Sequence, residues 1–465
     1  MKFLHHCFIS CAVYSCYING TTNALSFRES AAIPAISSHL RRNLQDGLID
    51  NFCTGDGFIA GIVCSLLETL GIYEPPSAAP TPFVIIDQTA SICDIHDKSY
   101  TSFRRGESII GVQDQSNVGL SVSLSMEGTR LAVGENGGMK VYDFFTTDPE
   151  EAPGWVDISN GTSSADFSSY IVSVSLSSDG NHLVVGQQQS IGKRALGSVE
   201  VYSRVDNSNW IKNGQTLPGD EDDGFGRSVD ISDDGTLIAV GAPFASYVSV
   251  YSLEGFFWEL QFFEEKGNFG WSVALSTNGK ILAIGTPTPE VNSRGAVHVF
   301  EIGPNTLIQE IIGDTVGDEF GYSVALAVDG LRLVIGAPGA DYVKIFNFNT
   351  ESFVELDEVE LKPDVINSRF GHSVAVSRNS ARVAVGAPNY DVNGENAGAT
   401  FLFNVICGNS SLVEVIDGTS RTNEAGRSVS LSETGSILAM GEIFSDGNTS
   451  VNSGQVQVFE FLETE

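Results

Sequence analysis

A unit of about fifty residues recurs seven times along this chain, and no other feature limits its fold as strongly. Each copy holds a serine followed by a glycine 13 residues later. The serines are Ser121, Ser173, Ser228, Ser272, Ser323, Ser373 and Ser428, and the glycines are Gly134, Gly186, Gly241, Gly285, Gly336, Gly386 and Gly441. A spacing this constant in seven copies indicates one structural unit, repeated, and not a bias of composition.

Each unit has the pattern of a small antiparallel sheet. In the fourth copy, residues 270–276 alternate with period two, a Thr-Asn-Gly turn follows, and residues 281–284 are apolar, which predicts a hairpin. Residues 295–302 and 306–312 predict a third and a fourth strand. Four short strands per unit are typical of a β-propeller blade, whereas a row of sandwich domains needs about a hundred residues per domain. The sequence therefore predicts an all-β, seven-bladed β-propeller.

The chain also predicts how the ring closes. The seventh copy ends after three strands, and a strand-like run at residues 107–112 precedes the first copy. We expect this run to complete the last blade, because an incomplete ring exposes a strand edge. The predicted ring spans residues 106–465, after a signal peptide (1–24), a partly helical N-terminal segment with a Pro-rich linker (25–82) and a lead-in (83–105).

The N-terminal residues and the charge bear on localisation and partners. A basic start, a short apolar run and small residues near residue 24 are typical of a secretory signal peptide. No later run is long enough to predict a transmembrane segment, so we expect a secreted, monomeric ring. Lys and Arg number 25 against 58 Asp and Glu, a net charge of −33, which argues against nucleic acid as a partner.

Cysteines and glycosylation motifs fit secretion. Four cysteines remain after the signal peptide, Cys53, Cys64, Cys93 and Cys407. Pairing Cys53 with Cys64 leaves Cys93 for Cys407, and four free buried thiols are the alternative. The acceptor motifs begin at Asn160, Asn409 and Asn448.

The repeat resembles a known family. Residues 225–243 begin with Phe-Gly, continue with Arg-Ser-Val and end with Gly-Ala-Pro, and the copies that begin at Phe320 and Phe370 match equally well. This pattern is similar to the FG-GAP repeat of integrin α-subunit propellers. The resemblance implies an extracellular recognition or adhesion role. The family's calcium-binding turns between the first two strands are longer than the turns of this chain, which are too short to encircle an ion.

Loop lengths distinguish the two faces of the predicted ring. The strands of a blade run alternately up and down, so the loops that join them alternate between the two faces of the ring. The loops between strands one and two (first–second) and three and four (third–fourth) share one face, here called the turn face. The loops between strands two and three (second–third) and from strand four to the next blade (fourth–first) share the other, the loop face. Length varies on the loop face, which is typical of a rigid scaffold that presents a binding surface, although drift in unconstrained loops is the alternative. In most copies a glycine, here called the opening glycine, stands two residues before the constant serine, and the residue between them lies at this face. These residues are Leu120, Arg227, Trp271, Tyr322, His372 and Arg427. We predict that Arg227, Trp271, Tyr322, His372 and Arg427 contact a ligand, and packing between blades is the alternative.

Acidic residues are also expected on the loop face. Asp220–Asp223, Asp314 and Asp318–Glu319 lie in fourth–first loops. Asp391, Asn393 and Glu395 form half of a calcium-loop pattern without the closing acid, so a solvated polar loop is the alternative reading. We expect no firmly bound cofactor, and any calcium to bind weakly on this face.

The sequence offers no catalytic set. It has no nucleophile elbow, zinc-binding His-Glu-x-x-His motif or phosphate loop. We therefore expect a non-enzymatic extracellular scaffold that binds a protein or a glycan through the loop face. The alternative is a secreted propeller hydrolase that acts on glycans or with metal assistance, with its site at the ring axis.

Overall fold

The computed structural model describes residues 17–18, 25–26, 99–145, 153–160, 169–191, 194–206, 209–287, 294–327, 330–349, 352–406, 408–446 and 450–464. The chain divides into two units, residues 1–88 and 89–465. In the first, the described residues are β1 (Tyr17–Ile18) and β2 (Leu25–Ser26), paired antiparallel. The remainder of the predicted signal peptide and N-terminal segment, and all four cysteines, lie outside the described residues.

The second unit is a ring of seven antiparallel sheets, as predicted. Blades 1 to 4 follow one another along the chain. Blade 1 comprises β5 (Ser121–Leu124), β6 (Arg130–Glu135), β7 (Gly138–Phe145) and β8 (Gly154–Asp157). Blade 2 comprises β9 (Ser169–Leu176), β10 (His182–Ile191), β11 (Arg194–Arg204) and β12 (Trp210–Lys212), with β13 (Leu217–Glu221) also paired to β11. Blade 3 comprises β14 (Ser228–Ile231), β15 (Leu237–Ala242), β16 (Tyr247–Glu254) and β17 (Phe257–Glu265), and blade 4 comprises β18 (Ser272–Leu275), β19 (Ile281–Thr286), β20 (Ala296–Glu301) and β21 (Thr306–Ile312).

The last three blades follow the same order. Blade 5 comprises β22 (Ser323–Leu326), β23 (Arg332–Ala337), β24 (Tyr342–Phe348) and β25 (Phe353–Leu361). Blade 6 comprises β26 (Ser373–Val376), β27 (Arg382–Ala387), β28 (Ala399–Ile406) and β29 (Asn409–Asp417). Blade 7 comprises β30 (Ala425–Leu431), β31 (Ile437–Glu442) and β32 (Gln455–Glu463), completed by the N-terminal strands β3 (Tyr100–Arg104) and β4 (Ile109–Ile110). The first strand of each blade contacts the first strand of the next, and β30 contacts β5, so the first strands line the ring axis.

The constant serine–glycine spacing reflects strand register and contact between blades. Ser323 lies opposite Gly336 in the β22–β23 pair, and the corresponding residues are paired in blades 1 to 6. The Ser323 hydroxyl donates a hydrogen bond of 2.7 Å to the carbonyl oxygen of Gly371 in the next blade. A Cβ on Gly336 would lie 2.1 Å from that same oxygen. The glycine is therefore required because the backbone of the next blade occupies the space of a side chain.

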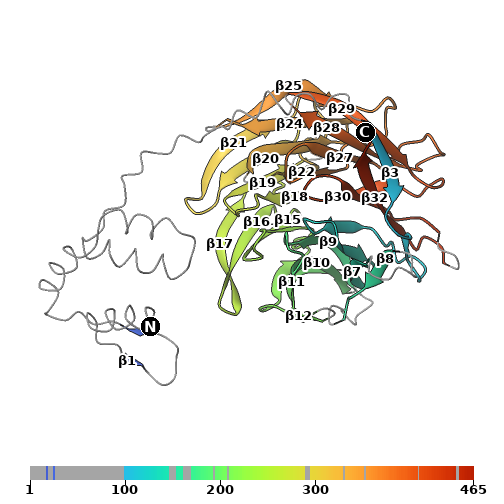
Figure 1. Cartoon of the computed structure of the whole chain (residues 1–465). Helices are drawn as coiled ribbons and strands as arrows, with labels where there is room; N and C mark the ends of the chain where they lie inside the picture. Colours follow the sequence, from blue (N-terminus) through green and yellow to red (C-terminus); the bar gives the residue numbers. More distant parts are fainter. Residues whose placement is uncertain are drawn as a thin grey trace, which may run out of the picture. The chain divides into compact units, whose positions relative to one another are not determined.

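Closure by an N-terminal strand is confirmed, but the closing segment begins earlier than predicted. Ile109 and Ile110, within the predicted run, pair with β32. The longer pairing is made by β3, which runs antiparallel to β32 beside the C-terminus (Figure 1). The predicted boundary at residue 106 is therefore wrong, because Tyr100–Arg104 belongs to the ring. This strand is largely exposed and polar, and so it lacks the apolar pattern that marks the inner strands.

The hydrophobic core consists of separate clusters between neighbouring blades. Phe225, Phe269, Phe320 and Phe370 precede the opening glycines, and each is at most 1% exposed. Phe320, for example, packs between Val297 of blade 4 and Leu333 of blade 5. This phenylalanine thus joins two blades, which explains why it recurs at the start of four units.

Candidate functional site

The five predicted binding residues come together in the structure. Each directly precedes the constant serine of its blade, and the first strands that follow are neighbours around the axis. The Arg227 guanidinium lies 4.5 Å from the centre of the Trp271 ring, and the Trp271 and Tyr322 rings are 5.5 Å apart. Tyr322 is 4.9 Å from the His372 ring. Arg227, Trp271, Tyr322, His372 and Arg427 are here called the aromatic–arginine arc, and all five are half-buried.

His372 is held in its neutral form. Burial and the positive charges of Arg427 and Arg369 lower its pKa to about 3. Its Nε2 atom is 3.2 Å from the hydroxyl of Tyr322, with the donor set by the tautomer. At neutral pH the arc therefore gains no charge from His372, and its positive charge comes from arginines.

Three further residues belong to this cluster: Arg369 and Glu424 were missed in the sequence analysis, and Glu319 was predicted only as an acidic residue of the loop face. Arg369 lies 5.2 Å from the Tyr322 ring and pairs with Glu319 at 2.8 Å. Glu424 pairs with Arg427 at 3.1 Å, and burial raises the pKa of its carboxyl group. The three residues share one position of the repeat, two residues before the opening glycine: Glu319 before Gly321, Arg369 before Gly371 and Glu424 before Gly426. This shared position was the sequence signal that could have found them.

The arc lies on the loop face. Isolated bridges join Gly295 to Phe320 and Gly398 to Ala425, which places second–third loops beside fourth–first loops as predicted. Leu120 is the corresponding residue of blade 1, and Val172 that of blade 2. The aromatic and charged residues therefore cover blades 3 to 7.

The turn face differs, because it is linked across the axis. Arg378 of blade 6 forms an ion pair with Asp233 of blade 3, and it donates a hydrogen bond to the Ser178 hydroxyl of blade 2. The predicted tight turns between first and second strands are confirmed. In blade 3, the amide of Gly235 donates a hydrogen bond of 2.9 Å to the Ser232 carbonyl oxygen, and Gly235 has a φ of 70°. Hence the two ends of the first strands present different chemistry.

The predicted acidic loops are exposed only in part, because Asp220, Asp222 and Asp314 are exposed while two other aspartates are buried. Asp223 and Asp318 are 3% and 0% exposed. Asp223 accepts hydrogen bonds from the Phe225 amide and the Tyr247 hydroxyl, at 2.7 and 2.8 Å. Asp318 accepts a hydrogen bond of 2.5 Å from the Tyr342 hydroxyl. These carboxylates stabilise the turns before the Phe-Gly pairs, a role that charge counting does not reveal, while Asp220 stays exposed.

The predicted metal ligands have protein partners. Asp391 accepts a hydrogen bond of 2.6 Å from the Asn396 amide, and Glu395 pairs with Arg421. The Asn393 amide lies 3.5 Å from the Gly418 carbonyl oxygen. Among the described residues, no three His, Cys, Asp or Glu side chains form a group that could hold a metal ion. Weak calcium binding stays a prediction.

The glycosylation motifs are partly described. Asn160 and Asn409 are exposed, and Asn448 lies outside the described residues. Within the described part of the chain, no helix is long and apolar enough to cross a membrane.

The loop face also carries a pocket of about 390 Å³ at blade 7. None of the five arc residues lines it. Its lining residues come from the closing segment and two loops of the last blade, and they are Arg104, Ser108, Thr419, Ser420, Arg421, Thr422, Asn423, Phe444, Ser445, Asp446, Val451, Asn452 and Gln455.

Comparison with known proteins supports the fold of this chain and nothing finer. No family model and no curated protein matches the sequence. The β-propeller domain of Cps50 (Swd1) from Myceliophteria thermophila is 14% identical, with 78% of this chain and 99% of that chain covered and a TM-score of 0.50. A chain of the mitotic checkpoint complex is 14% identical, with 77% and 90% covered and a TM-score of 0.50. The protein is a seven-bladed β-propeller, and its resemblance to the FG-GAP repeat stays a prediction.

Proposed function

We propose that this chain is a non-enzymatic extracellular recognition scaffold of FG-GAP type, which binds a protein or glycan partner through the loop face. The observation that carries the proposal is the aromatic–arginine arc. Trp, Tyr and Arg are the residue types that contribute most to binding energy when they lie together in a partly desolvated cluster. Here five successive blades bring them into contact, and each remains half-buried.

Contacts within the arc order its side chains before a partner binds. Arg227 stacks on Trp271, and Arg369 stacks on Tyr322 while its charge is paired with Glu319. Cation–π contact and ion pairing hold these long side chains in place before a partner arrives. A partner therefore meets a partly ordered surface, which lowers the entropy lost on binding.

The hydrolase alternative finds weaker support at the ring axis. Burial raises the pKa of Asp230 to about 6, which is a property of many catalytic acids. However, Asp230 accepts hydrogen bonds from Ser175 and from the Leu275 amide, at 2.8 and 2.7 Å, and so it serves to join blades 2, 3 and 4. The neighbouring Asp233 is committed to Arg378. These contacts favour a structural role.

The proposal can be tested on arrays of extracellular proteins and glycans, with and without calcium. We expect a saturable ligand whose binding weakens by about tenfold or more in Trp271→Ala, the loss of about 1.4 kcal/mol or more. The matched control is Phe256→Ala, which removes an aromatic ring that is 83% exposed on the turn face. Equal binding by the two variants would contradict the proposal. A large fall in the melting temperature of Trp271→Ala alone would assign this residue to packing between blades.

A further inference from the structure

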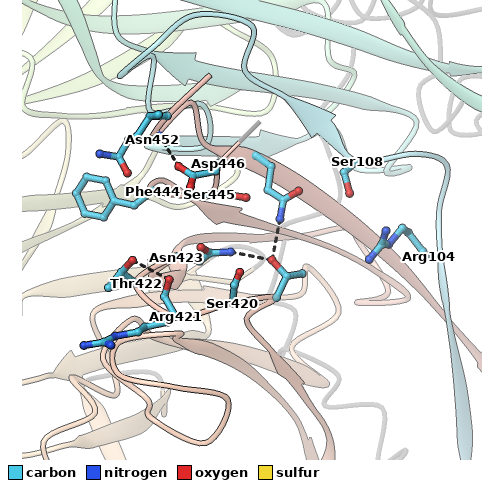
Figure 2. A pocket seen from close by; sticks show the side chains of 13 residues that line it. Arg104, Ser108, Ser420, Arg421, Thr422, Asn423, Phe444, Ser445, Asp446 and Asn452 are labelled. Carbon is cyan, nitrogen blue, oxygen red and sulfur yellow. Dashed lines mark hydrogen bonds between the residues drawn. The ribbon is translucent and has the colours of Figure 1, made fainter. Parts of the chain in front are cut away.

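The pocket of blade 7 lies where the two ends of the ring meet. Figure 2 shows Asp446 and Asn452 on one side, Ser420 and Asn423 on the other, and Arg104 with Ser108 at one end. Its volume of about 390 Å³ is within the range of small-molecule pockets, roughly 300–1,000 Å³. Its lining differs from the mostly apolar lining of such pockets, because hydroxyl and amide side chains predominate. A ligand that fits must therefore offer many hydrogen-bonding groups.

A buried carboxylate orients two of the amides. Glu442 is 0% exposed and accepts hydrogen bonds from Asn423 at 3.0 Å and from Gln455 at 2.7 Å. Thr419 and Gln457 also donate to it. A carboxylate only accepts, so the NH₂ groups of Asn423 and Gln455 must face Glu442. Their carbonyl oxygens are then directed away from Glu442 and remain acceptors for a ligand.

Other lining groups have hydrogen-bonding capacity to spare. Among the described residues, the side chains of Ser108, Ser420 and Asn452 form no hydrogen bond, whereas Arg104 donates to Gln457 at 2.7 Å. Phe444 adds a half-buried ring to the lining. The pocket thus combines donors, acceptors and one aromatic surface.

We propose that this pocket binds one saccharide residue of a glycan. Each sugar hydroxyl both donates and accepts, which matches a lining of hydroxyls, preoriented amide oxygens and a guanidinium. The C–H face of a sugar ring is apolar and can pack on Phe444. The pocket lies on the same loop face, but none of the five arc residues lines it, so the inference names a second site within the function proposed above and its test can fail independently of the arc.

The test mixes the full chain with each of five sugars: glucose, galactose, mannose, N-acetylglucosamine and glucuronic acid. Binding of each sugar is measured by ligand-observed NMR. We expect at least one sugar to bind with a dissociation constant of about 1 mM or tighter. Phe444→Ala should weaken binding by about tenfold. Its matched control is Phe244→Ala, which changes the residue at the same repeat position in blade 3, where the side chain is 64% exposed. Phe256→Ala, on the turn face and outside both sites, should bind the sugar as the wild type does.

Ser420→Trp provides a second variant, because Ser420 is exposed and a large ring there fills the pocket without disturbing the core. It should abolish sugar binding at an unchanged melting temperature. Arg104→Ala distinguishes the sugar types: it should weaken glucuronic acid more than a neutral sugar, because only the acid carries a carboxylate. The proposal is wrong if no sugar binds, if Phe444→Ala and Phe244→Ala behave alike, or if Ser420→Trp still binds.

Discussion

The hydroxyl of Ser428 donates a hydrogen bond of 2.7 Å to the carbonyl oxygen of Gly119, which lies 309 residues earlier in the chain. The same bond joins Ser228 to Gly270, Ser272 to Gly321, Ser323 to Gly371 and Ser373 to Gly426. The contact that closes the ring is therefore the same as the contacts that join blades 3 to 7 in sequence.

Ser428→Ala and Ser323→Ala should destabilise the ring equally. Each change removes one hydrogen bond between blades and costs about 1 kcal/mol in the free energy of unfolding. Chemical denaturation of both variants checks the expectation. A cost for Ser323→Ala with none for Ser428→Ala would show that blades 7 and 1 are not joined in this way.

Gly441→Ala should be more harmful than the loss of a hydroxyl. A Cβ at this position would lie 2.1 Å from the carbonyl oxygen of Gly119, so the backbone of blades 7 and 1 must separate. We expect a loss of about 1–3 kcal/mol, by denaturation. The control is Gly138→Ala, where an added Cβ has no neighbour within 4 Å, and this variant should unfold close to the wild type. Similar losses in both would contradict the close approach at Gly441.

Removal of β3 should open the ring. A chain that begins at Ser99 retains β3, whereas one that begins at Glu107 retains only β4 against β32. The shorter chain exposes most of the β32 edge, and it also loses the contact between Tyr100 and Arg382, 4.4 Å from ring centre to guanidinium. We expect a lower melting temperature and aggregation measurable by light scattering. Equal behaviour of the two chains would count against closure through β3.

His372 should make stability depend on pH. Its folded-state pKa of about 3 lies below the ordinary value of 6.5, so the unfolded chain takes up a proton that the folded chain does not. Stability therefore falls as the pH drops below about 6.5, by up to about 2 kcal/mol at pH 5. His372→Phe should show a smaller loss between pH 7 and pH 5. An NMR titration that places the His372 pKa near 6.5 would refute this expectation.

The inner half of each blade was predictable, and the outer half less so. The Ser–Gly spacing fixes the β22–β23 register because any other register would put a side chain against the neighbouring backbone. Tyr100–Arg104 was missed because an outer strand can be polar on both faces, so its sequence has no pattern that burial would impose.

The site shows a similar division. The arc could be predicted because its residues share one position in the repeat. The role of Asp223 could not, because its partner, the Tyr247 hydroxyl, belongs to the third strand and sequence spacing alone does not bring the two together. The pocket likewise combines Arg104 with Asn423 and Asn452, which become neighbours only when the ring closes.

Hydrogen exchange in the presence of the strongest array ligand tests the central claim most directly. The account predicts slower amide exchange in peptides that contain Arg227, Trp271, Tyr322, His372 and Arg427. Peptides from the first–second turns, such as the one that contains Asp233 and Gly235, should exchange as in the free protein. Protection confined to those turns, with none at the arc, would contradict recognition through the loop face.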